Sequence, residues 1–125
     1  FQKTEQNVTV LYDLKGYDEI SLTGTTKALS RNSERVLTPA DFGVKQLQAT
    51  QISGGSSLAS SAEIFMNIIQ NKGTEAQQNV VCANAGMALA TALNLSPIEG
   101  FEKAKESLLS GKAFIALSTL QNLSK

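Results

Sequence analysis

Asp18 and Glu19 are adjacent carboxylates placed where a strand is expected to end. They follow a β-branched and aromatic run at residues 8–12 and then Gly16, a pattern that predicts a strand entering a turn. In open α/β sheets, ligands bind beyond the carboxyl ends of strands. A carboxylate pair there can hold Mg²⁺ together with substrate phosphates. Most adjacent acids are solvated turn residues, so this assignment depends on the rest of the chain.

Cys82 is the only cysteine, and the chain contains no histidine. One cysteine excludes an internal disulfide. The lack of histidine excludes a Ser-His-Asp triad and histidine-ligated metals, and it leaves the thiol without an imidazole base. Because its neighbours are apolar, Cys82 is expected to be a small buried residue.

Two other polar features each have a ligand-binding and a structural interpretation. The loop Gly54-Gly55-Ser56-Ser57 could present backbone amides to a phosphate. No lysine follows it as in a P-loop, so a flexible loop is the favoured interpretation. Asn84 lies in an apolar helical stretch and could contact a ligand, but a buried amide more often satisfies backbone groups.

The first third of the chain has the pattern of β-structure. Residues 8–12 are the clearest strand, and residues 25–30 and 34–37 flank a short polar turn, as in a hairpin. The apolar residues of 8–12 are nearly continuous, which is typical of a strand covered on both faces. The run Thr38-Pro39-Ala40-Asp41 is a helix-start signal, here for a single turn because Gly43 follows.

The rest of the chain has helical periodicity in about four segments. Capping signals mark most of the starts, and Gly73 is expected at the left-handed position that ends the first helix. The second helix is apolar on most of its circumference, which predicts an interior position. The expected helices are residues 58–72, 75–94, about 97–110 and 112–123.

Composition limits the class of protein. The chain has 125 residues, 42% apolar and 18% charged, with 11 basic residues balancing 11 acidic ones. This suits one folded domain, and zero net charge gives no electrostatic footprint for nucleic acid or a membrane surface. With no signal peptide or spanning stretch visible, a cytoplasmic protein is expected. Because it begins with Phe1, we expect a piece of a longer chain.

Six short sequence blocks follow one another in order along nearly the whole chain. They are Gly16-Tyr17-Asp18-Glu19-Ile20-Ser21, Gly24-Thr25-Thr26-Lys27, Leu37-Thr38-Pro39-Ala40-Asp41-Phe42-Gly43, Gly54-Gly55 before Ala62, Asn84-Ala85, and Ser110-Gly111-Lys112-Ala113. Together these blocks resemble the C-terminal part of the α/β domain of anthranilate phosphoribosyltransferases. One departure is Ala59-Ser60-Ser61, where that family often has acidic and amide residues, and it puts only a helix cap in doubt.

The resemblance implies an enzyme of tryptophan biosynthesis that transfers phosphoribosyl from phosphoribosyl pyrophosphate to anthranilate. It implies an α/β fold of the nucleoside phosphorylase and phosphoribosyltransferase type, with N-terminal strands and a hairpin followed by about four helices. Asp18 and Glu19 match the acidic pair that holds Mg²⁺ on the diphosphate. Residues 1–125 match the C-terminal portion of that domain, so the helical N-terminal domain, the pyrophosphate loop and the substrate contacts are expected upstream.

Several expectations follow from this partial coverage. No catalytic residue is assigned within the chain, and alone it is expected to be inactive. Without its neighbours, the strand at residues 8–12 is expected to be exposed, so the chain is expected to self-associate through it or to rearrange residues 1–7 to cover it. The resembling family is thought to dimerise through its N-terminal helical domain, so such a dimer would be a different one. A pyrimidine nucleoside phosphorylase-like enzyme and a non-catalytic nucleic-acid-binding relative remain as alternatives.

Overall fold

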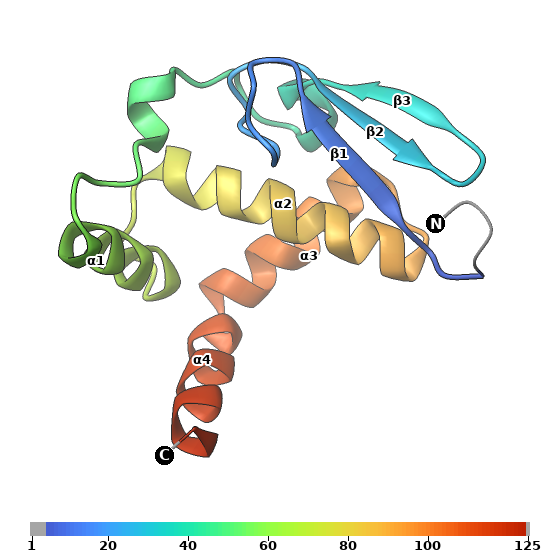
Figure 1. The fold of residues 1–125 in the computed structure, drawn as a ribbon. Coiled ribbons are helices and arrows are strands. Elements are labelled where there is room, and N and C mark those ends of the chain that lie inside the picture. The colour runs from blue at the N-terminus through green and yellow to red at the C-terminus, as the bar shows by residue number, and fades with distance from the viewer. Residues whose placement is uncertain (1–4, 125) are drawn as a thin grey trace.

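The sheet is small, antiparallel and placed at the N-terminal end of the chain (Figure 1). The computed structural model describes residues 5–124. Strand β1 (Thr9–Asp13) pairs with β2 (Thr26–Ser30), which pairs with β3 (Glu34–Leu37). The β2–β3 turn is closed by a 2.8 Å bond from the Ser30 amide to the Ser33 carbonyl. The predicted hairpin and first strand are therefore confirmed to within a residue.

Only one face of the sheet is covered by the described chain. Val10 and Tyr12 of β1 are 50% and 57% exposed, whereas Leu11 is half-buried and Asp13 is fully buried. The expectation that β1 is covered on both faces is wrong for residues 5–124, because the helices pack on one side of the sheet only (Figure 1). Within these residues β1 is an edge strand. The expected covering by residues 1–7 includes residues 1–4, which lie outside the described residues.

Four α-helices follow two short 3-10 turns. The first helix stops at Ile69, and the left-handed residue after it is Asn71 (φ 61°) rather than the predicted Gly73. The chain turns early because the Asn71 amide already bonds to the Ile68 carbonyl at 3.0 Å. The elements are the 3-10 turns Pro39–Phe42 and Ala49–Ile52 and the helices α1 (Leu58–Ile69), α2 (Glu75–Leu93), α3 (Pro97–Leu109) and α4 (Lys112–Leu123).

Helix α2 lies between the sheet and α3, while α1 and α4 extend from the body (Figure 1). The core joins apolar residues from the loops, the sheet and both central helices, and Phe42 and Phe101 meet in it with ring centroids 6.3 Å apart. The opposite side of α2, which includes Val81 and three alanines, is exposed. The prediction of an interior α2 therefore holds for one side of the helix only.

The crossing of α2 and α3 depends on two glycines. A Cβ added to Gly86 would lie 2.6 Å from the Phe101 nitrogen and 2.7 Å from its Cα, and one added to Gly100 would strike the Gly86 backbone. The obstacles are backbone atoms, so a side-chain rotation cannot relieve the overlap. The two helices can approach this closely only while both positions lack a side chain.

We predict that Gly100→Ala lowers the free energy of unfolding by about 1–3 kcal/mol or more, because the added methyl forces α2 and α3 apart. Urea unfolding followed by circular dichroism measures this. The matched control is Gly54→Ala, since a Cβ at Gly54 would have no neighbour within 4 Å. Equal stabilities for the two variants would contradict the close crossing.

Candidate metal centre

Asp18 and Glu19 lie in the irregular connection between β1 and β2, at residues 14–25. Both side chains are exposed, and neither makes a hydrogen bond or ion pair with any residue that the structure describes. The described sheet is antiparallel, so the rule for the ends of parallel strands does not explain their position. Their placement comes instead from polar anchors on both sides of the pair.

The first anchor is Asp13, which the sequence analysis did not single out. Its side chain is 0% exposed at the end of β1. One oxygen accepts from the Lys15 amide at 2.7 Å, and the other accepts from the Ser21 amide at 3.1 Å, the Ser21 hydroxyl at 2.7 Å and the Thr26 hydroxyl at 3.3 Å. A buried carboxylate needs such donors. The feature of the sequence that could have pointed to Asp13 is an acidic residue at the end of an apolar strand, with serines and threonines after it.

The second anchor is Asn84 on α2. Its Oδ1 accepts from the Ile20 amide at 2.9 Å, and its Nδ2 donates to the Ile20 carbonyl at 2.8 Å and to the Val80 carbonyl at 2.9 Å. The interpretation of Asn84 as a group that satisfies backbone atoms is therefore confirmed. This amide joins α2 to the residue directly after Glu19.

The segment after the pair is also held in place. Ile20 and Leu22 are 2% and 1% exposed, and Leu22 adopts a left-handed φ of 59°. The Leu22 carbonyl accepts from the Leu47 amide at 2.9 Å, and the Thr23 carbonyl accepts from the Gln46 side chain at 2.8 Å. The two acids thus project from a connection whose flanks are fixed.

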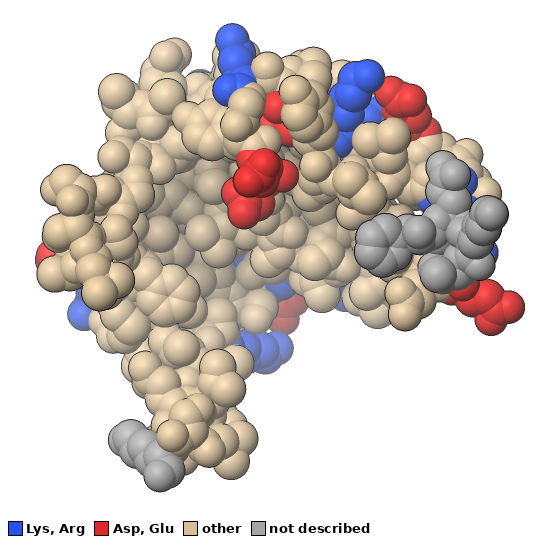
Figure 2. Space-filling model, viewed as in Figure 1, with Lys and Arg blue, Asp and Glu red and all other residues tan. Residues whose placement is uncertain are grey.

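The donor set fits Mg²⁺ held by few protein ligands. Among residues 5–124 no group of three or more His, Cys, Asp or Glu side chains gathers around one point. In the view of Figure 2, the acidic side chains likewise lie in small separate groups. Mg²⁺ is commonly bound by one or two carboxylates and completed by waters and substrate phosphates. Asp18 and Glu19 are two exposed carboxylates, and their oxygens are donors of the hard kind that such a site would need.

The other candidates from the sequence are engaged in structure. The amides of Ser56 and Ser57, in the Gly54–Ser57 loop, donate to the Ser60 hydroxyl at 3.1 and 3.0 Å, and the Ser57 side chain caps α1. The amides of Ser56 and Ser57 are therefore not free to bind a phosphate. The N-terminal cap of α1, which the Ala59-Ser60-Ser61 departure put in doubt, is formed by Ser57 and Ser60. Burial raises the pKa of the Cys82 thiol, which disfavours the thiolate.

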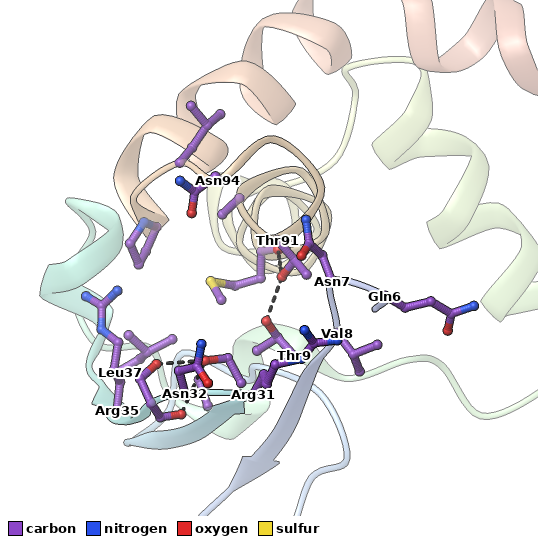
Figure 3. Close-up of a pocket in the computed structure, with 17 residues that line it drawn as sticks. Gln6, Asn7, Val8, Thr9, Arg31, Asn32, Arg35, Leu37, Thr91 and Asn94 are labelled. Carbon is purple, nitrogen blue, oxygen red and sulfur yellow. Dashed lines mark hydrogen bonds between the residues drawn. The ribbon is translucent and has the colours of Figure 1, made fainter. Parts of the chain in front are cut away.

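A separate pocket of about 560 Å³ lies between the hairpin, the start of β1 and the C-terminal half of α2 (Figure 3). Arg31 and Arg35 line it, and a 2.8 Å hydrogen bond between the Thr9 and Thr91 hydroxyls joins two of its walls. Neither acid of the pair lines this pocket. The pocket and the candidate metal centre are therefore different places on the surface.

Among the described residues, none of the helices α1–α4 alone combines the length and apolarity needed to cross a bilayer. Helices α2 and α3 reach that length and apolarity only when they are taken together, and the chain bends by 117° between them.

Comparison with known proteins identifies the family. The model of the glycosyl transferase family, a/b domain, matches residues 2–114. The chain belongs to this family.

Within this glycosyl transferase family, similar curated proteins are named anthranilate phosphoribosyltransferase. The one from Christiangramia forsetii is 61% identical over 125 residues, which is 100% of this chain and 38% of that protein. The one from Flavobacterium psychrophilum is 58% identical over 99% of this chain and 38% of its own length. The motif-based resemblance is thereby confirmed, and the chain spans about 38% of the length of these relatives.

Solved structures support the fold. Anthranilate phosphoribosyltransferase from Thermus thermophilus has a TM-score of 0.77 at 24% identity, covering 89% of this chain and 33% of that one. The Saccharomyces cerevisiae enzyme in complex with PRPP and Mg has a TM-score of 0.74 at 20% identity, covering 88% and 32%. At these identities the likeness shows the α/β fold alone.

We predict that Asp13→Asn lowers the free energy of unfolding by about 1–3 kcal/mol, because an amide nitrogen replaces an acceptor and leaves a buried donor unpaired. Urea unfolding at pH 7 measures the loss. The control is Glu34→Gln, which removes an exposed 3.1 Å ion pair with Lys27 and should cost less than about 1 kcal/mol. If Asp13→Asn cost no more than its control, the anchoring role assigned to Asp13 would be wrong.

Proposed function

We propose that this chain supplies the acidic, Mg²⁺-holding segment of an enzyme that transfers phosphoribosyl from phosphoribosyl pyrophosphate to anthranilate. The observation that carries the proposal is the exposed Asp18-Glu19 pair on a connection fixed by Asp13 and Asn84. The names of the relatives support the substrates, and the yeast neighbour, with PRPP and Mg bound, supports the cofactor. The relatives' names also favour this enzyme over the two alternatives.

The chemistry of this reaction explains what the pair contributes. An aromatic amine displaces pyrophosphate from the anomeric carbon, so negative charge grows on the leaving group while the sugar gains oxocarbenium character. Mg²⁺, when bound, neutralises charge on the diphosphate and orients it. Asp18 and Glu19 would hold that ion from a connection that needs little reorganisation, which is what electrostatic preorganisation requires.

The pair alone does not make a complete site. The proposal assigns no group in this chain to gripping the ribose or the anthranilate ring, so the isolated chain is proposed to be inactive. Nor would it hold an ordered Mg²⁺ without a diphosphate, because Mg²⁺ dehydrates reluctantly and relies on phosphates for part of its shell. A cytoplasmic location is part of the proposal, supported by the free, buried thiol of Cys82, which suits a reducing compartment.

The test uses a full-length enzyme in which this chain replaces the matching region of the Christiangramia forsetii relative. The double variant Asp18→Asn with Glu19→Gln keeps shape and removes two charges. We predict that it lowers kcat and raises the Mg²⁺ concentration for half-maximal rate at least about tenfold, because two metal ligands lose their charge. A magnesium titration of the initial rate measures both.

The matched control is Glu102→Gln with Glu106→Gln, which removes two charges from exposed side chains of α3. It should leave the magnesium titration unchanged. An unaltered titration in the Asp18 and Glu19 variant would refute the metal role. The isolated chain serves as the zero-activity reference, and turnover by it would show that the site is more complete than proposed.

The unpaired edge of β1 is proposed as the contact through which the isolated chain self-associates with a second copy. Val10 and Tyr12 expose an apolar surface on the uncovered face beside this edge. On the other face, a groove of about 400 Å³ runs between β1 and α2 and is lined in part by Leu11 and Ala88. An unpaired edge strand beside an apolar surface is a template for pairing with another chain.

We predict that sedimentation velocity shows the mass growing with concentration, and that Val10→Lys with Tyr12→Lys shifts the chain toward the monomer, because two ammonium groups oppose burial of this surface. The control is Leu120→Lys with Leu123→Lys, which charges exposed apolar positions of α4. A strict monomer at high concentration, or an equal effect of the control, would rule out this contact.

A further inference from the structure

We propose that Asn84 is a positioning residue for the acidic pair: from α2 it fixes the peptide that joins Glu19 to Ile20 and so sets the direction in which the carboxylates project. This inference deepens the proposed function and rests on it. Asn84 is distant from the pair in sequence, at 64 residues from Ile20, and it is not itself a proposed metal ligand.

The geometry of the amide leaves it one orientation. Oδ1 accepts from the Ile20 N–H at 2.9 Å, while the two Nδ2 protons go to the carbonyls of Ile20 and Val80 at 2.8 and 2.9 Å. Turning the amide over would place an N–H against an N–H and an oxygen against two carbonyls. The Val80 bond lies within α2, so the helix fixes the amide, and the amide fixes Ile20.

The bond to the Ile20 N–H reaches back to Glu19 through the peptide plane. No cis peptide occurs among the described residues, and in a trans peptide the C=O and the N–H point in opposite directions. With the Ile20 N–H facing α2, the Glu19 carbonyl faces away from it. This sets one backbone dihedral of Glu19 directly.

On the other side, the Tyr17 carbonyl accepts from the Asp13 amide at 3.3 Å. Asp18 and Glu19 are therefore the two residues between one backbone anchor and the next. Burial of the Ile20 side chain, 2% exposed, holds the segment against the core but does not select a peptide orientation. That selection is the contribution of Asn84, and it predicts a role in metal affinity beyond stability.

The first measurement needs no enzyme activity. In the 125-residue chain, hydrogen exchange measured by NMR should show that the Ile20 amide is protected. In Asn84→Ala the same amide should exchange at least about tenfold faster. The matched control is Thr91→Val on the same helix, whose hydroxyl bonds to Thr9 at 2.8 Å at the other end of β1. It should leave Ile20 exchange unchanged. An Ile20 amide that exchanges alike in all three proteins would overturn the proposal.

The second measurement uses the full-length chimera described above. Asn84→Ala should raise the Mg²⁺ concentration for half-maximal rate about 10–100-fold, the range seen when groups that orient metal ligands are lost, with kcat largely recovered at saturating Mg²⁺. Thr91→Val should leave the titration unchanged. If Asn84→Ala fails to fold by circular dichroism, Asn84→Asp replaces it, since that variant keeps the size and the acceptor but loses the donors.

The outcomes separate the two proposals. A lower kcat with an unchanged magnesium titration, or an equal shift in Thr91→Val, would mean that Asn84 acts on folding alone and would overturn the positioning role. A shift in the Asp18 and Glu19 variant without one in Asn84→Ala would leave the proposed function standing and refute this inference. If neither shifts, the proposed function itself fails.

Discussion

A carboxylate removed from water must be met by hydrogen-bond donors or it destabilises the fold, and Asp13 imposes that constraint here. Its two oxygens accept hydrogen bonds from the Lys15 amide and from polar groups of Ser21 and Thr26. Meeting these donors obliges the chain to leave β1, turn and return beside it. The shape of the connection that carries Asp18 and Glu19 is thus set by a charge that is not part of the candidate site.

The second constraint is the narrow crossing of α2 and α3. Gly86 and Gly100 bring two backbones together, and Gly86 follows closely after Asn84, the α2 residue whose side chain binds the Ile20 backbone. A wider crossing would shift this part of α2, and the two hydrogen bonds from Asn84 to Ile20 tolerate little displacement. The packing of α2 against α3 therefore affects the geometry of the acidic pair through the side-chain amide of Asn84.

Local patterns in the sequence were sufficient for the elements whose causes are local. The hairpin about residues 31–33, the Pro39–Phe42 turn and the helices beginning after Thr74 and Ser96 all depend on neighbouring residues, and the structure agrees. Asp18 and Glu19 were also recognisable, because their motif is contiguous. Their fixed surroundings were not, because burial of Asp13 depends on hydroxyl groups that only the folded chain brings together.

The two wrong predictions, the end of α1 and the covering of β1, also concern features that depend on the folded chain. Gly73 was the expected end of α1, but the backbone turned at Asn71, since an asparagine tolerates the left-handed region and the first available bond closed the helix. The apolar run of β1 predicted cover on both faces, yet composition does not say which neighbours are present. The apolar side chains of β1 favour burial, but the described residues cover only one face of this strand.

The link between Asn84 and Ile20 also bears on how such a site can be transplanted. Residues 13–26 form the visible loop, but the unit that keeps its shape is discontinuous and includes one asparagine on a helix 64 residues further on. A design that grafts the loop alone onto a new scaffold would carry the two carboxylates of Asp18 and Glu19 without the hydrogen bonds from Asn84 that hold Ile20. A pattern search restricted to the linear motif would, for the same reason, retrieve loops that share these letters and not this geometry.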